Sequence, residues 1–152
     1  MKQSGFTLIE LLVVIGIFAI LASIGLFFSM DFFRTYSTTS EETTLVSTLS
    51  KARSQSLANI NGYQHGVRIT GTGYTIFEGP GTAGTPLTWA TRITASDQVI
   101  PVGSSVHSVT NTDVVFAQLS GNATCTSGCA INMTGGGYNK TISINSEGAI
   151  LW

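Results

Sequence analysis

The carboxylate of Glu10 lies at the start of an apolar run that extends from Leu11 to Phe28 without a charged residue. A charge within a membrane segment costs about 2.5–3.5 kcal/mol on insertion scales, so Glu10 is a functional candidate by default. Within its own chain, the carboxylate suits the first turn of a helix, whose N-terminal end is partly positive. Between chains, an amine of a neighbouring copy would relieve the cost. The residue types leave both interpretations open.

Cys125 and Cys129 are the two cysteines of the chain and lie four positions apart. In an extracytoplasmic domain, such a pair most simply forms a disulfide. The closed loop is short, so the chain-entropy model gives the bond only about 2 kcal/mol. Two reduced thiols are one alternative, and a zinc site completed by His65 and His107 is another, although neither histidine has finger-like spacing. We expect the disulfide and no metal.

Other patterns that could carry chemistry lack the context that they need. Residues 79–84 fit G-x-G-x-x-G, but a dinucleotide site needs a helix straight after the glycines, and here Pro86 and a Thr-rich stretch follow. No G-x-S-x-G elbow is present, and the carboxylates are scattered. We therefore expect neither an enzyme nor a cofactor.

Length and charge narrow the function classes further. A chain of 152 residues suits one compact domain with an appendage. Charged residues make up 10% of the chain, and the formal net charge is −1. Duplex DNA binding needs a dense Lys/Arg face, so the composition disfavours nucleic acid as a partner.

The segment 6–28 has the length of a membrane span. Its 23 residues make a helix of about 35 Å, and a bilayer hydrocarbon core is about 30 Å thick. A secretory signal would have a shorter apolar core in front of its cleavage site. Lys2 weakly favours an N-terminus in the cytoplasm, with the rest of the chain outside.

The helix is expected to continue as an amphipathic half over residues 29–61. This stretch has neither Pro nor Gly, and Asn61-Gly62 is a good stop signal. Its apolar stripe consists of Leu45, Leu49, Ala52, Ser56 and Ile60. Residues 37–40 have poor helix propensity, which leaves a local weakening there as an alternative.

Residues 62–152 are predicted to form a β-rich domain. Residues 64–70 and 73–78 are typical of a hairpin, and residues 79–86 of a loop. Further strands are expected at residues 98–102, 106–110, 113–118, 130–133, 141–145 and 149–152. The predicted fold class is therefore α+β, with a long N-terminal helix packed on a C-terminal antiparallel β-sheet domain, which consists of two sheets or of one curved sheet.

The leader Met1–Gly5, the motif Phe6–Glu10 and the apolar helix together resemble the prepilin signal of type IV pilins and type II secretion pseudopilins. The resemblance implies that residues 1–5 are a leader peptide, that a prepilin peptidase cuts between Gly5 and Phe6, and that Phe6 is then N-methylated. The new amine would lie four residues before Glu10 on the same helix face. In a filament, Glu10 would pair with the Phe6 amine of a neighbouring subunit.

Short patterns in the second half are similar to the minor pseudopilins of the H type and to related minor pilins. They lie at residues 50–58, 66–69, 113–116 and 142–148. The resemblance implies a structural subunit of a type IV pilus or type II secretion pseudopilus, and a minor one that initiates or tips the filament. The alternatives are a major pilin and a DNA-binding minor pilin that would use Arg68, Arg92 and Lys140.

The same resemblance implies the partners and the location. The partners are other pilin or pseudopilin subunits, the prepilin peptidase/methyltransferase and an inner-membrane assembly platform. Before assembly, the subunit would cross the inner membrane once, with its apolar helix in lipid. After assembly, it would belong to a periplasmic or cell-surface filament.

Overall fold

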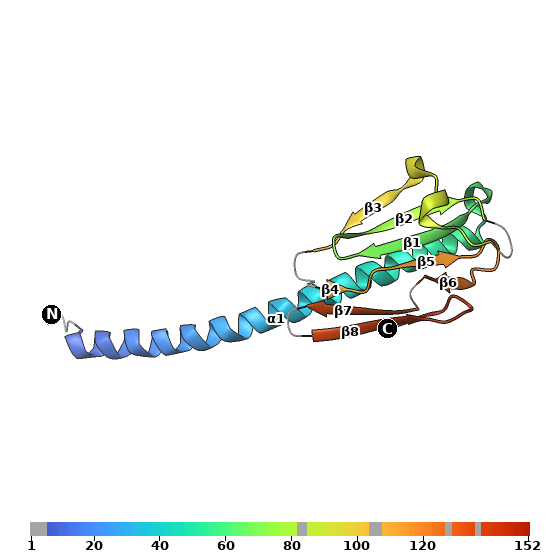
Figure 1. Cartoon of the computed structure of the whole chain (residues 1–152). Coiled ribbons are helices and arrows are strands. Elements are labelled where there is room, and N and C mark those ends of the chain that lie inside the picture. Colours follow the sequence, from blue (N-terminus) through green and yellow to red (C-terminus); the bar gives the residue numbers. More distant parts are fainter. Residues whose placement is uncertain (1–5, 82–84, 104–107, 127–128, 136–137) are drawn as a thin grey trace.

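The computed structural model describes residues 6–81, 85–103, 108–126, 129–135 and 138–152. Gly5 and His107 lie outside these ranges, and the side chains of residues 26–31, 34 and 108 are not described either. The fold is α+β, as the sequence predicts. One long helix carries an antiparallel β domain on its second half, and its first half extends beyond the domain as a stem (Figure 1).

Helix α1 runs from Leu8 to Leu57 as one element of 50 residues. It passes through residues 37–40 without interruption, so the weakening considered for that stretch is absent. The hydroxyls of Thr43 and Thr44 donate to the carbonyl oxygens of Thr39 and Ser40, at 3.0 and 2.9 Å. These side chains are thus satisfied within the helix rather than competing with it from outside.

The helix ends a few residues before the predicted stop. Asn59 and Asn61 both adopt left-handed backbone angles, with φ of 53° and 55°, and Ile60–Gly62 forms the short 3-10 helix η1. Asparagine tolerates this conformation better than most residues. The carbonyl oxygen of Ser56, near this helix end, accepts from the N–H of Asn59 at 3.1 Å and from the N–H of Leu119 at 3.0 Å, so it has partners both beside the helix end and in the β domain.

The β domain consists of two antiparallel sheets. The first has the strand order β3-β2-β1-β5-β6, and the second has the order β4-β7-β8-β9. The first sheet contains β1 (Gln64–Thr70), β2 (Gly73–Gly79), β3 (Gln98–Pro101), β5 (Thr112–Phe116) and β6 (Ala123–Cys125). The second contains β4 (Ser108–Val109), β7 (Ala130–Gly135), β8 (Tyr138–Ile144) and β9 (Ile150–Leu151). Two more 3-10 helices, η2 (Trp89–Thr91) and η3 (Thr94–Ser96), lie between β2 and β3.

Most of the predicted strands are found, with shifted ends. The hairpin of β1 and β2 is confirmed, and its register pairs Thr70 with Gly73. The strand expected to reach residue 118 ends at Phe116 because a turn follows, in which the N–H of Gly121 donates to the carbonyl oxygen of Ala117. Strand β6 was not predicted; it is only three residues long, too short for a period-two pattern.

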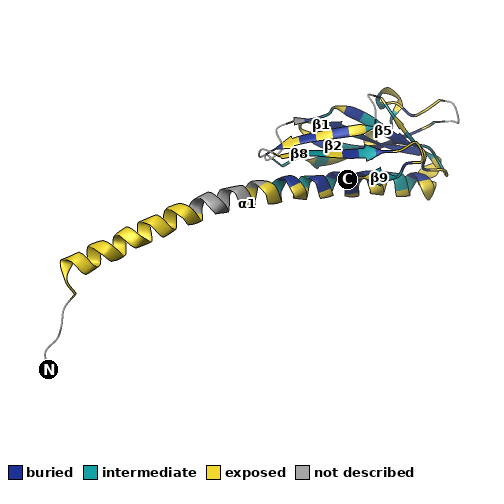
Figure 2. Ribbon diagram, turned by 90° about the horizontal axis from the view of Figure 1, so that it is seen from below, coloured by how far each residue is buried: buried dark blue, intermediate teal, exposed yellow. Residues whose placement is uncertain are grey.

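The core lies between the second half of α1 and both sheets. The helix buries one broad stripe, made of Thr38, Glu42, Leu45, Val46, Thr48, Leu49, Ala52 and Ser56. Figure 2 shows this change along α1, from a wholly exposed stem to a helix with one buried face. Val67, Val114, Ile131 and Ile142 pack on the stripe from the two sheets. Ile60, predicted to extend the stripe, is 43% exposed because the helix has ended before it.

A smaller apolar cluster covers the other face of the first sheet. Phe77, Leu87 and Val115 are buried in it, and Trp89 packs against them. The guanidinium of Arg68 lies 4.0 Å from the centroid of the Trp89 ring, and that of Arg92 lies 3.5 Å from it. Two groups so close to one centroid must lie on opposite faces. Arg68, on β1, thus holds Trp89 on the sheet, while Arg92 stacks on Trp89 from within the same segment.

Candidate functional site

The first turn of α1 forms around Thr7 and Glu10. Thr7 is the N-cap, with extended backbone angles, and the N–H of Glu10 donates to its hydroxyl at 3.4 Å. Oε2 of Glu10 accepts from the N–H of Thr7 at 3.0 Å and from the Thr7 hydroxyl at 2.9 Å. These reciprocal bonds form a capping box, which satisfies backbone donors at the helix start.

The geometry refines the two interpretations of Glu10. Its partner within the chain is Thr7, and both of those bonds end on Oε2. A carboxylate has two oxygens and can accept further bonds, so the capping box leaves it able to accept from another chain. Thr7 was not singled out in the sequence. The pattern T-x-x-E before an apolar run was the signal that could have identified it.

Phe6, the residue expected to become the new N-terminus, lies just outside α1. Its side chain is 90% exposed, and it stands one residue before the N-cap. The other side of the expected cleavage point, Gly5, is outside the described residues. A bond between Gly5 and Phe6 therefore precedes the helix rather than lying within it, and segments outside regular structure are where proteolytic cleavage concentrates.

The stem after Glu10 has the properties of a membrane segment. Residues Leu8–Gly25 form a helix that is long and apolar enough to cross a membrane, and no part of them is buried within the chain. A Cβ atom added at Gly16 or Gly25 would meet nothing within 4 Å outside the helix's own nearby backbone. The small residues of the stem thus do no packing within this chain, and they leave its surface open to lipid or to other helices.

The stem is joined firmly to the β domain where the two meet. The hydroxyl of Thr38 donates to the carbonyl oxygen of Gly135 at 3.3 Å, in the second sheet. Oε1 of Glu41 accepts from the N–H of Gly103 at 2.7 Å. Gly103 lies in the segment that follows β3. Glu42, largely buried, pairs with Lys140 at 3.0 Å. These contacts fix the start of the second half of α1 to the second sheet and to the segment that follows β3.

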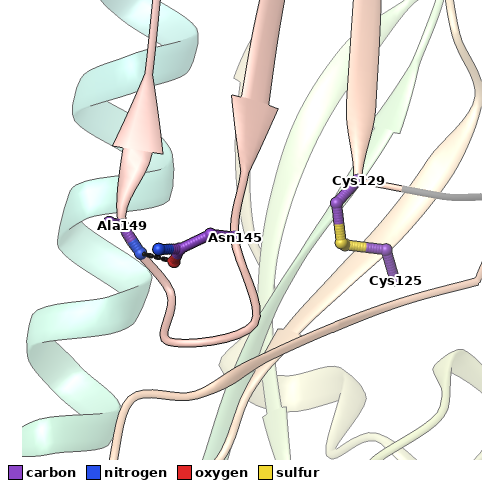
Figure 3. Close-up of a disulfide and its surroundings, with 4 residues drawn as sticks. All are labelled: Cys125, Cys129, Asn145 and Ala149. Carbon is purple, nitrogen blue, oxygen red and sulfur yellow. Dashed lines mark hydrogen bonds between the residues drawn. A yellow bond between two sulfur atoms is a disulfide. The ribbon is translucent and has the colours of Figure 1, made fainter.

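The disulfide lies where the two sheets meet. Cys125 ends β6 in the first sheet, and Cys129 precedes β7 in the second; their sulfur atoms are bonded (Figure 3). The N–H of Ile144 donates to the carbonyl oxygen of Cys129 at 2.9 Å. On the neighbouring turn, the N–H of Ala149 donates to Oδ1 of Asn145 at 2.7 Å (Figure 3). The disulfide between Cys125 and Cys129 thus links two sheets that do not share a strand.

His65, considered for a zinc site, lies elsewhere in the fold. It is buried on β1, with its ring atom Nε2 3.1 Å from Oε2 of Glu78. The backbone N–H of His65 donates to Oγ of Ser56 at 2.9 Å. Burial lowers the pKa of His65, more than the charge of Glu78 raises it. Among the described residues, no group of three or more His, Cys, Asp or Glu side chains could hold a metal ion.

Glu78, the partner of His65, also has a shifted pKa. Burial raises it, but hydrogen bonds from Ser96 and Asn61 together with the nearby His65 lower it by more. The amide of Asn61 contacts both carboxylate oxygens, at 3.1 and 3.0 Å. The contacts among Ser56, Asn61, His65 and Glu78 join the end of α1 and the turn after it to the hairpin of β1 and β2, which gives these residues a structural role.

The three basic residues considered for DNA binding all have carboxylate partners. Arg68 holds Asp113 by two bonds of 2.7 Å each. Arg92 pairs with Asp97 at 2.9 Å, and Lys140 pairs with Glu42 at 3.0 Å. A phosphate would compete with these carboxylates at each position, so the geometry adds to the compositional argument against nucleic acid.

Comparison with known families bears on the N-terminal segment. The model of the prokaryotic N-terminal methylation motif matches residues 1–26, which include Gly5, Phe6 and Glu10. This motif is the signature of type IV pilins and pseudopilins, a class of structural subunits. The resemblance drawn from residues 1–10 and the apolar helix is thus confirmed, while its narrower H-type form stays a prediction. No curated protein and no solved structure matches the chain.

Proposed function

We propose that this chain is the precursor of a filament subunit of a type IV pilus or type II secretion pseudopilus. The methylation motif carries the proposal, since it lies on an exposed apolar helix that is joined firmly to a β domain. In this proposal, residues 1–5 are removed, Phe6 is N-methylated, and the subunit waits in the inner membrane. Its partners are the prepilin peptidase/methyltransferase, the assembly platform and other subunits.

The assembly step transfers the stem from lipid to neighbouring stems. The stem is apolar all round and exposed, so its burial requires another molecule. Glu10 supplies the specific contact: its carboxylate accepts the Phe6 amine of a neighbouring subunit. That pairing neutralises a charge that is costly in an apolar surrounding. We assign the subunit a minor, initiating or tip, role, and its ratio to other subunits in sheared filaments tests that assignment.

Two variants separate the pairing role of Glu10 from its capping role. Glu10→Gln keeps an oxygen that can accept from Thr7 but loses the charge. Thr7→Ala removes the N-cap hydroxyl but keeps the carboxylate, and cap losses cost about 1 kcal/mol. We expect both variants to insert into the membrane, Glu10→Gln to be absent from filaments, and Thr7→Ala to be present.

The readouts are membrane fractionation, filament shearing and mass spectrometry of the N-terminus. A wild-type chain that starts at N-methylated Phe6 in filaments supports the proposal. A chain that still starts at Met1 and is found only in membranes contradicts it. Equal loss of filaments in both variants would assign Glu10 to capping alone and remove the pairing step.

A further inference from the structure

Three aromatic side chains lie exposed on α1 between the stem and the β domain. Phe32, Phe33 and Tyr36 are 75%, 70% and 66% exposed. They come after the apolar segment Leu8–Gly25 and before Thr38, which is buried against the β domain. Large aromatic side chains gain much from leaving water, so three of them exposed together indicate a partner outside the chain.

The three side chains share one side of the helix. With about 100° between successive residues, Phe32, Phe33 and Tyr36 all lie within about 60° of one direction. The face that α1 buries against the β domain, from Thr38 to Ser56, is centred on the opposite direction. We name Phe32, Phe33 and Tyr36 the aromatic stripe. The β domain of the same chain cannot cover it.

The distance of the aromatic stripe from the stem matches a membrane surface. Tyr36 lies about 42 Å along the helix from Leu8, and a hydrocarbon core is about 30 Å thick. In an upright helix, Tyr36 would lie about 12 Å above the hydrocarbon, beyond the headgroup layer. A tilt of about 20°, the average for membrane helices, brings this side chain into the layer only if the helix leans toward the aromatic stripe.

We propose that the aromatic stripe is a lipid-contact surface that lies in the headgroup layer and sets the direction in which the helix tilts. Tyrosine favours this layer, where its apolar ring and its polar hydroxyl are both accommodated, and the rings of Phe32 and Phe33 add apolar area beside it. Because the stripe faces away from the β domain, a helix that leans onto it lifts the domain clear of the bilayer. The proposal rests on the proposed membrane-inserted state, before assembly.

The lipid surface is the occupant that the arrangement favours. The stripe continues along the same helix from the apolar segment, so it lies next to the bilayer whenever that segment is inserted. A second copy of the chain is the competing occupant. It would bring two stripes together and shield them from lipid as well as from water, which gives a different signal in the experiment below.

Spin labels at two neighbouring positions test the direction of tilt. Tyr36→Cys places a label on the stripe, where Phe32 and Phe33 remain, and Thr35→Cys places one about 100° away, toward the domain side. The processed, oxidised chain is labelled without reductant, so that Cys125 and Cys129 stay bonded. It is then placed in vesicles of phosphatidylethanolamine and phosphatidylglycerol. Oxygen and a water-soluble nickel complex report the depth of each label.

We expect the label at residue 36 to be several-fold less accessible to nickel than the label at residue 35, although it is farther along the helix. In a Phe32→Ser/Phe33→Ser background, this order should reverse. A deeper label at residue 35 in the unaltered background overturns the proposal. Shielding of residue 36 from both oxygen and nickel, with dipolar broadening, also overturns it and assigns the stripe to a second copy.

A third label separates this proposal from the proposed function. Ile15→Cys lies in the middle of the apolar segment and is exposed. An oxygen-accessible, nickel-protected label there shows that the stem is inserted, so a wrong order at residues 35 and 36 then counts against the aromatic stripe alone. A label at Ile15 that nickel reaches freely removes the membrane-inserted state and, with it, both proposals.

Discussion

The two halves of α1 have the same secondary structure but opposite surroundings. Residues 8–25 are apolar on every side and wholly exposed, whereas residues 38–57 bury one stripe and expose Ser, Thr and Lys on the others. The backbone hydrogen bonds of a helix are satisfied within it, so they do not depend on which side chains it carries. The difference between the halves lies in the partner that each requires: the second half has its partner within the chain, and the first half needs another molecule.

The largest expected effect is a difference in domain stability between two variants, each of which shortens a leucine in one half of α1. Leu49 is fully buried in the core, and Leu21 is 60% exposed on the stem. Leu49→Ala should lower the free energy of unfolding of the β domain by about 2–5 kcal/mol, because it removes buried methyl groups and leaves a cavity. Leu21→Ala should change it by less than about 0.5 kcal/mol.

Denaturant unfolding in detergent, followed by circular dichroism of the β domain, measures both values. The same substitution in both variants makes them matched controls for each other. A loss at Leu21 as large as that at Leu49 would mean that the stem is packed within its own chain, which would break the comparison between the halves.

A smaller effect is expected from adding one methyl group at a glycine in each region. A Cβ at Gly66 would lie 2.7 Å from the Phe77 ring and 3.0 Å from the carbonyl oxygen of Val114, whereas one at Gly16 would meet nothing within 4 Å. Gly66→Ala should therefore cost about 1–3 kcal/mol of domain stability through overpacking. Gly16→Ala should leave domain stability unchanged and favour the helix by up to about 1 kcal/mol.

The value of the Gly16 variant lies in a second readout. If neighbouring stems approach each other closely at Gly16, the added methyl group should reduce the yield of filaments while the fold is intact. Filament shearing beside thermal unfolding of both variants tests this. A destabilised domain in Gly16→Ala, or an unaffected one in Gly66→Ala, would contradict the contacts on which the comparison is based.

How much of this the sequence predicts differs between the two regions. The stem is determined by local information: an uncharged apolar run and a T-x-x-E cap, both readable along the chain. Its predicted features, the apolar helix and the methylation motif, are confirmed. The division of the β domain into two sheets depends on pairings between distant segments, such as His65 with Phe116, which no local pattern specifies.

The same contrast between local and long-range information holds for the residues of the candidate site. Glu10 and Phe6 could be named because the motif is local, but the contact of His65 with Ser56 could not. Glu78 lies 13 positions after His65, and the two-residue turn of the predicted hairpin already sets the register that brings it opposite, whereas Ser56 comes from the separate helix. The sequence leaves His65 as an alternative zinc ligand for this reason, since it offers residue types without the packing around them.

The smallest expected effect is a pH dependence that belongs to the β domain alone. Burial lowers the pKa of His65 below its ordinary 6.5, so the unfolded chain takes up a proton first as the pH falls. The unfolded state then binds more protons than the folded state, and stability must fall with decreasing pH. The lowered pKa of Glu78 adds a second loss of the same sign below 4.5.

Chemical unfolding at a series of pH values between 7.5 and 4 measures this slope, and His65→Gln is the matched variant. We expect the variant to lose the decline that begins near the ordinary pKa of histidine, 6.5, and to show a weaker one below 4.5, because His65 helps to lower the pKa of Glu78. The fraction of the chain that inserts its stem into vesicles should not fall with the decline in domain stability that begins near the ordinary pKa of histidine, because His65 and Glu78 both lie in strands of the first sheet. A decline that persists unchanged in His65→Gln would assign it to other groups, and a parallel loss of insertion would show that the two halves of the helix are coupled.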